Sequence, residues 1–142
     1  MRPDERRQNF AVEVLDEVGY GKLDATELCA AAFTSKGLDT ERMGEVSVVL
    51  VDPETMRDLN RKFRGIDAPT DVLSFEIDGP YGEMVGEIVI SPDHASSEMG
   101  VEELVVHGAL HLSGMDHGEN FEESEMARVQ DAVMKAVRNP EG

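Results

Sequence analysis

The stretch HGALHLSGMDH runs from His107 to His117 and contains three of the four histidines in this chain of 142 residues. His107 and His111 are four residues apart, so on a helix both lie on one face, with about 5–6 Å between their Cβ atoms. Gly114 can end that helix in a left-handed conformation at no steric cost, which lets His117 fold back toward the other two imidazoles. The stretch therefore predicts a metal site with three histidine ligands at the C-terminal end of a helix.

The ligand set favours zinc. Three neutral imidazoles at about 2.0–2.1 Å, with a fourth position open to water, are typical of a catalytic rather than a structural zinc ion. The first two histidines stand in an apolar run, where imidazole nitrogens without partners would be costly to bury. Imidazole also accepts Fe²⁺, Ni²⁺ and Mn²⁺. We predict one zinc ion per chain, bound by His107, His111 and His117.

This stretch differs from a zinc peptidase motif at one decisive residue. Metzincin peptidases carry H-E-x-x-H-x-x-G-x-x-H, in which the Glu is the general base. Gly108 stands at the position of that Glu. Peptide hydrolysis by that route is therefore not expected, and the base must come from the metal-bound water, from a carboxylate elsewhere or from the substrate.

Length and composition predict one domain over residues 1–142. Apolar residues make up 40% of the chain, and no stretch approaches the ~20 apolar residues that a membrane span needs. The charged start MRPDERRQNF predicts no secretory signal. The single cysteine, Cys29, suits a reducing compartment and lies in an alanine-rich stretch that predicts a core position. We expect a cytoplasmic protein that does not bind membranes.

The charge balance is strongly acidic, with 30 acidic and 13 basic residues and a net charge of −17. Such a balance keeps a protein soluble and argues against DNA binding or general nucleic-acid affinity, which depend on clustered cations. Arg57, Arg61, Lys62 and Arg64 nevertheless fall within eight residues. From the residues alone, this cluster is equally well interpreted as a phosphate site or as a solvated helix face with ion pairs to neighbouring acids.

Hydrophobic periodicity and capping signals predict an α+β fold, with a small mixed sheet of about four strands packed with helices. Asp52-Pro53-Glu54 is a strong helix start, and Asp24 is a candidate N-cap. The expected strands are Phe10 to Asp16, Glu45 to Val51, Val72 to Ile77 and Met84 to Ile90. The expected helices are Asp24 to Lys36, Asp52 to Lys62, a region from Ser91, Glu102 to Ser113 and Glu122 to Val137. In the last helix, Met126, Val129, Val133, Met134 and Val137 are expected to face inward.

A second motif, RGIDAPTDVLSF from Arg64 to Phe75, precedes the strand GEIVI from Gly86 to Ile90. Together with the histidine stretch, these segments resemble the YbeY family of bacterial metal-dependent single-strand endoribonucleases. The resemblance extends from about Val46 to the last helix. The chain departs from the family's usual pattern at Glu76, where a proline is common, and at Glu87, where an aspartate is.

The resemblance implies a zinc-dependent endoribonuclease that acts in ribosomal RNA maturation and ribosome quality control. It implies His107, His111 and His117 as ligands and Arg64 as the catalytic or substrate-holding arginine. The implied partners are single-stranded RNA, ribosomal RNA in particular, and the ribosome or proteins associated with it. Such a zinc ion can produce hydroxide or polarise a phosphoryl oxygen, while an arginine stabilises charge on the phosphate.

Other roles near the motif stay open at this stage. Asp116 could orient a ligand imidazole or cap the helix, and His94 is expected at the surface rather than on the metal. Asp71 and Ser74 are expected to hold the start of a strand near the site. Three functions remain: an RNA endonuclease, another zinc-dependent hydrolase, or a non-catalytic ribosome-associated factor with structural zinc.

Overall fold

The central sheet follows from the apolar segments of the sequence. A computed structural model describes residues 11–35, 43–78, 84–95, 100–113 and 124–138. In these residues, β1 (Ala11–Asp16), β2 (Met43–Leu50), β3 (Val72–Asp78) and β4 (Met84–Ile90) form one sheet in the order β1-β2-β4-β3. β2 pairs in parallel with β1 and β4, and β3 pairs antiparallel with β4. The predicted α+β class with a four-stranded mixed sheet is confirmed.

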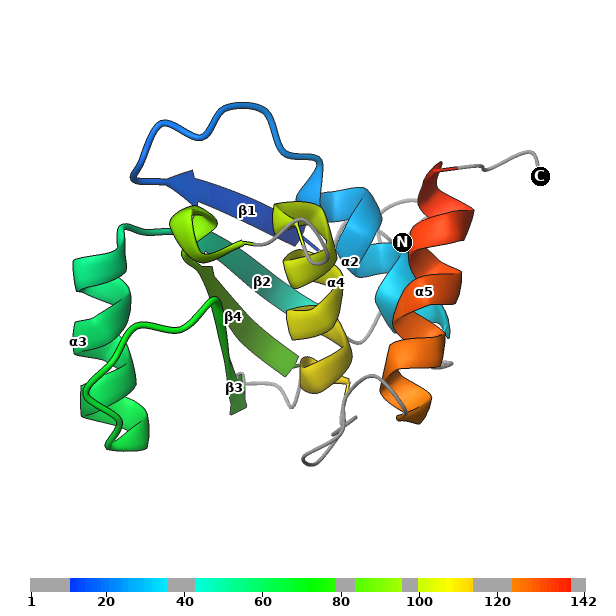
Figure 1. The fold of residues 1–142 in the computed structure, drawn as a ribbon. Helices are drawn as coiled ribbons and strands as arrows, with labels where there is room; N and C mark the ends of the chain where they lie inside the picture. Colours follow the sequence, from blue (N-terminus) through cyan, green and yellow to red (C-terminus); the bar gives the residue numbers. More distant parts are fainter. Residues whose placement is uncertain (1–10, 36–42, 79–83, 96–99, 114–123, 139–142) are drawn as a thin grey trace.

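Helices cover the two faces of the sheet unequally (Figure 1). α2 (Ala25–Ser35), α4 (Val101–Leu112) and α5 (Glu125–Arg138) gather on one face, and α3 (Pro53–Arg64) packs on the other. The larger core lies under the first three helices, with β2 and β4 contributing alternate side chains. The smaller core joins Met56 of α3 to Val49, Leu73 and Val89. The C-terminal halves of β2 and β4 are thus buried on both faces, which explains their continuous apolar sequence, whereas Glu45 and Glu87 nearer the strand starts are exposed.

The start of α3 confirms the capping signal. Asp52 has extended backbone angles, and its carboxylate accepts a hydrogen bond of 2.7 Å from the Thr55 N–H. Pro53 takes the first helical position, where no N–H is needed. This helix runs two residues beyond the expected end at Lys62. It stops at Arg64 because Gly65 adopts a left-handed conformation, with φ of 73°, and donates to the Arg61 carbonyl.

The remaining boundaries differ modestly from expectation. α2 and β4 fall where they were predicted, whereas α5 begins at Glu125 rather than Glu122. Of the helical region expected after Ser91, the described residues contain a three-residue 3₁₀ turn, Pro92–His94, and residues 96–99 lie outside them. The sequence also predicts a turn at Gly79–Gly82 between β3 and β4, and this turn lies outside the described residues.

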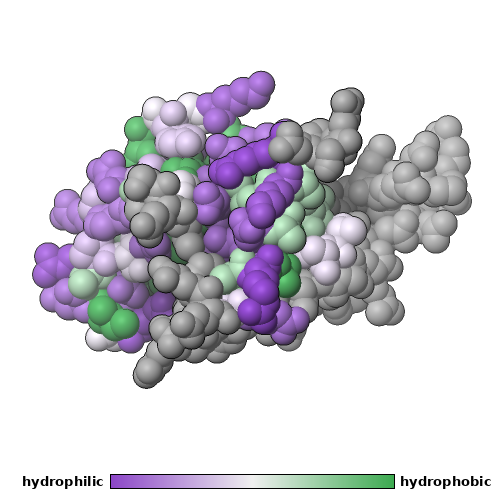
Figure 2. Space-filling view, turned by 45° about the vertical axis from the view of Figure 1, so that its right-hand side comes forward, coloured by the Kyte–Doolittle hydropathy of each residue, from purple (hydrophilic) through white to green (hydrophobic). Residues whose placement is uncertain are grey.

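The hydrophilic surface agrees with the many charged residues in the sequence. The face in Figure 2 is mostly hydrophilic, with hydrophobic residues in small separate patches. Cys29 is fully buried, as expected of a core residue, and burial raises the pKa of its thiol to about 12. None of the helices in the described residues is long and apolar enough to cross a membrane.

Candidate metal centre and substrate cleft

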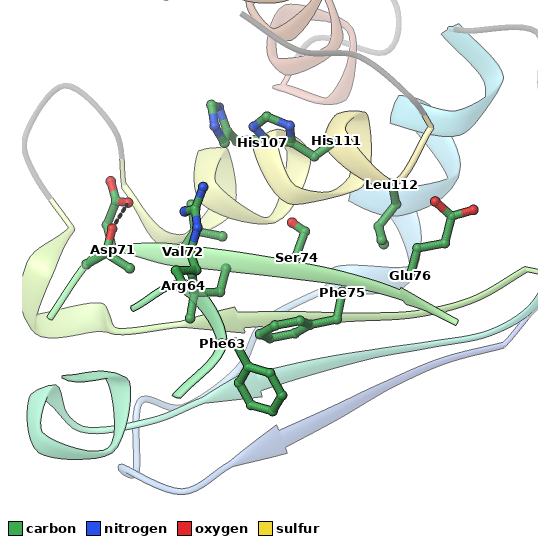
Figure 3. Close-up of a pocket in the computed structure, with 12 residues that line it drawn as sticks. Phe63, Arg64, Asp71, Val72, Ser74, Phe75, Glu76, His107, His111 and Leu112 are labelled. Atoms are coloured by element: carbon green, nitrogen blue, oxygen red, sulfur yellow. Dashed lines mark hydrogen bonds between the residues drawn. The ribbon is translucent and has the colours of Figure 1, made fainter. Parts of the chain in front are cut away.

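α4 brings two of the three predicted ligands together. His107 and His111 stand one helical turn apart, and their ring centroids are 4.8 Å apart, with the ring planes inclined by 72°. Figure 3 shows the two rings next to each other on α4. Two imidazoles held side by side in this way form half of a tetrahedral donor set.

The contact with Gln130 of α5 determines which ring nitrogen of His107 can bind a metal ion. The His107 ring is 7% exposed, and its Nδ1 lies 2.9 Å from Gln130 Oε1. Because a carbonyl oxygen only accepts hydrogen bonds, Nδ1 carries the proton and Nε2 keeps its lone pair. Metal-bound histidines nearly always have such a partner on the second nitrogen.

Sequence reasoning missed Gln130, although a signal was present. The residue is 4% exposed and lies on the inward face of α5 with Met126, Val133 and Met134. A single polar side chain in an apolar stripe needs a buried hydrogen-bond partner. Apolar periodicity predicts which face of this helix is buried, but it does not predict the role of a polar residue on that face.

Gly108 lies where α4 packs closely against the sheet. A Cβ at this position would be 2.5 Å from Ile88 Cγ2 and 3.1 Å from Ser74 Oγ. Ser74 Oγ donates to the Gly108 carbonyl at 3.3 Å, which joins β3 to α4. Position 108 therefore has no room for a glutamate without rearrangement, a physical reason for the absence of the peptidase base.

A cleft of about 730 Å³ runs along β3, which is an edge strand of the sheet (Figure 3). Ser74 and the two histidines lie on one side of β3, and Phe63 and Phe75 lie on the other. The lining residues come from the end of α3, from β3 with the residues before it, and from α4: Phe63, Arg64, Thr70, Asp71, Val72, Leu73, Ser74, Phe75, Glu76, His107, His111 and Leu112.

Arg64 is the member of the basic cluster that lines the cleft beside the histidines. Arg57 instead forms a bidentate pair with Asp67, at 2.8 and 3.1 Å, and Arg61 pairs with Asp58 at 3.1 Å. The hydrogen bonds from Arg57 hold the pKa of Asp67 below its usual value. Within the described residues, Arg64 has no carboxylate partner within ion-pair distance. The ion-pair interpretation of the cluster thus applies to Arg57 and Arg61, whereas a phosphate site at Arg64 stays a prediction.

Hydrogen bonds hold the loop after α3 against the helix and so fix the position of Arg64 at the helix end. The side-chain amide of Asn60, a buried residue, donates to the Ala68 carbonyl at 2.8 Å. The Ile66 N–H donates to the Asn60 carbonyl across the left-handed Gly65. The last turn of α3 is therefore anchored on both sides of Arg64.

The third predicted ligand cannot be placed. His117, Gly114 and Asp116 all lie outside the described residues, and the part of the chain that the structure describes contains no group of three metal-binding side chains. His94 is exposed, as expected, and its Nδ1 lies 2.9 Å from Ser91 Oγ. The two imidazoles that are placed fit a zinc ion, because neighbouring neutral imidazoles are among the donors that zinc prefers.

The profile of the family described as "Endoribonuclease YbeY" matches residues 16–138 of the chain. The chain belongs to this family. It is 71% identical over 133 residues to the endoribonuclease YbeY of Rubrobacter xylanophilus, with 91% of this chain and 97% of that protein covered. Identity to the YbeY of Mycolicibacterium paratuberculosis is 34%, with 89% of this chain and 82% of that one covered.

The fold is also found among solved structures. A Thermotoga maritima protein solved in solution matches with a TM-score of 0.52 and 29% identity, over 91% of this chain and 90% of that one. Membership in the YbeY family makes the chain a metal-dependent endoribonuclease of ribosomal RNA maturation. Of the three functions that the sequence left open, the RNA endonuclease is therefore the one supported.

Proposed function

We propose that the chain cleaves single-stranded RNA, ribosomal RNA in particular, with one zinc ion held by His107, His111 and His117. The observation that carries the proposal is the pairing of His107 and His111 in one cleft with Arg64. The YbeY relatives are named as endoribonucleases, which agrees with a cleft that joins imidazoles to an arginine.

The chain's own residues have distinct roles in this proposal. Gln130 keeps the proton on His107 Nδ1, so that Nε2 stays available as a ligand. Arg64 donates hydrogen bonds to two non-bridging oxygens of the scissile phosphate, a geometry that the planar guanidinium suits. As negative charge grows on those oxygens, the contact strengthens and lowers the barrier. When bound, the zinc ion supplies a Lewis acid and a water of lowered pKa.

The position of the cleft along an edge strand agrees with a single-stranded substrate. Sequence-independent contacts to RNA are made mainly to phosphates, and bases of single strands are free to turn toward protein side chains. Arg64 and the neighbouring Lys62 provide local positive charge at the end of α3 on an otherwise acidic chain.

The test is incubation of zinc-loaded protein with a labelled single-stranded RNA, beside the same RNA annealed to its complement. We expect cleavage of the single strand, little cleavage of the duplex, and loss of activity in His107→Ala. Elemental analysis should find one zinc per chain in the parent protein. Absence of stoichiometric metal, or full metal content in a variant lacking all three histidines, would remove the metal site. Stable RNA at full metal loading would overturn the activity.

A further inference from the structure

Phe63 is unusually exposed for a phenylalanine. Its exposed fraction is 56%, although it continues the apolar side of α3 from Met56, which is fully buried. The side chain lines the same cleft as Arg64, its neighbour in sequence. The ring therefore lines the cleft with more than half of its surface open to solvent.

The ring is held in place from one side. Its centroid lies 5.1 Å from that of Phe75, with the planes inclined by 61°, an edge-to-face contact. Lys62 Nζ lies 5.6 Å from the ring centroid. Phe63 therefore offers a fixed aromatic surface accompanied by a positive charge.

The position of the ring relates it to the candidate metal centre. Figure 3 shows Phe63 across β3 from His107 and His111, at the same end of the cleft as Arg64. A strand of RNA whose phosphate contacts Arg64 would carry a neighbouring base toward Phe63. Proteins that bind single strands combine cationic grooves with aromatic rings on which bases stack.

We propose that Phe63 is a stacking platform for a nucleobase next to the scissile phosphate, and so a substrate-positioning residue of the cleft. This inference rests on the proposed RNA cleavage. Stacking tolerates any base, because every base has a flat aromatic face. The platform therefore selects unpaired RNA over duplex, whose bases are already stacked on one another, without selecting a sequence.

The open edge of β3 also suits a peptide added as a further strand, and the experiment distinguishes this alternative. A peptide would bind through backbone groups and would respond to Phe63 as an apolar contact only. A nucleobase requires the aromatic face. Phe63→Leu should therefore weaken the binding of RNA but leave the binding of an added peptide strand unchanged.

The first experiment measures binding of a short 2′-O-methyl RNA to zinc-loaded protein by fluorescence anisotropy. We expect Phe63→Ala and Phe63→Leu to weaken binding by about 5-fold to 100-fold, the range for one stacked base. Phe63→Leu keeps an apolar contact to Phe75, so its thermal stability should stay near that of the parent. The matched control is Ile66→Ala, since Ile66 is 51% exposed but does not line the cleft. Parental affinity in Phe63→Leu would overturn the proposal.

The second experiment uses the absence of tryptophan from the chain. Phe63→Trp introduces a single indole, whose fluorescence a stacked base should quench in a saturable way. Inorganic polyphosphate, which has charge but no bases, should leave the emission unchanged. Quenching by both probes, or by neither, would contradict stacking.

Cleavage kinetics separate this proposal from the one on which it rests. Loss of a contact made equally in the bound and transition states raises KM and leaves kcat unchanged. We expect this pattern for Phe63→Leu on a cleavable single strand. If the parent protein cuts no RNA while base-dependent quenching persists, the proposed activity fails and the binding role of Phe63 stands. If the parent cuts RNA and Phe63→Leu has the parental KM, the stacking role fails alone.

Discussion

Gln130 of α5 and His107 of α4 are joined by a buried hydrogen bond of 2.9 Å between Oε1 and Nδ1. The two residues are 23 positions apart, and the helices that carry them pack against each other beside the sheet. This contact sets the tautomer of the imidazole that faces the cleft. It also makes the position of α5 a determinant of the candidate metal centre.

Replacing Gln130 should therefore weaken metal binding without removing a ligand. We expect Gln130→Leu to lower zinc affinity by about 10-fold to 100-fold, the usual effect of losing the partner of a ligand imidazole. Gln130→Glu retains an acceptor for Nδ1–H and should stay close to the parent. The measurement is a competition titration against a chelator of known affinity. Equal affinity in Gln130→Leu and the parent would show that the hydrogen bond does not support the site.

Arg64→Ala should retain the fold and the full metal content while losing RNA cleavage. Removal of one preorganised donor to a developing charge typically costs about 10²–10³ in rate. Arg64→Lys should recover little activity, because an ammonium keeps the charge but not the planar pair of donors. The control is Arg57→Ala, which breaks the exposed pair with Asp67 at a distance from the cleft lining. Cleavage at the parental rate by Arg64→Ala, at matched zinc content, would remove Arg64 from the mechanism.

Gly108→Ala should destabilise the protein, although glycine to alanine stabilises an ordinary helix interior by about 0.8–1 kcal/mol. The reason is the 2.5 Å approach of the new Cβ to Ile88 Cγ2. Overpacking of this kind costs about 1–3 kcal/mol. Urea unfolding of Gly108→Ala, Ile88→Ala and the double variant forms a cycle that isolates the contact. A double variant as unstable as the sum of the two single ones, or a stabilised Gly108→Ala, would contradict the close packing.

The cap of α3 should make part of the stability depend on pH. Hydrogen bonding from Thr55 lowers the pKa of Asp52 from its ordinary value of 3.8. A group with a lowered folded-state pKa stabilises the fold above its unfolded pKa and loses that contribution as the pH falls through the folded pKa. Asp52→Ala should therefore be less stable than the parent at pH 6, and the difference should shrink below pH 4. Urea unfolding across this range tests it, with Asp52→Asn, which keeps an uncharged cap, as the control. A difference that does not change with pH would show that the carboxylate charge adds nothing to the cap.

Local signals in the sequence were enough to predict most of the elements. The helix start at Asp52 and the strands β2 and β4 are specified by residues close to them in the chain. Each of these elements lies where it was expected. The i,i+4 spacing of His107 and His111 likewise needs only a helix to bring the rings together. The third ligand, His117, remains a prediction, because it lies outside the described residues.

Contacts between distant segments could not be derived in this way. The sequence showed that position 108 is a glycine, but only the packing of α4 on β4 shows that Ile88 excludes a side chain there. The ion pair from Arg57 to Asp67, rather than to an acid on its own helix, depends on the loop after α3 folding back. The same folding leaves Arg64 in the cleft. Sequence determines local structure through caps and periodicity, whereas partners such as Gln130 for His107 are decided by how the helices pack around the sheet.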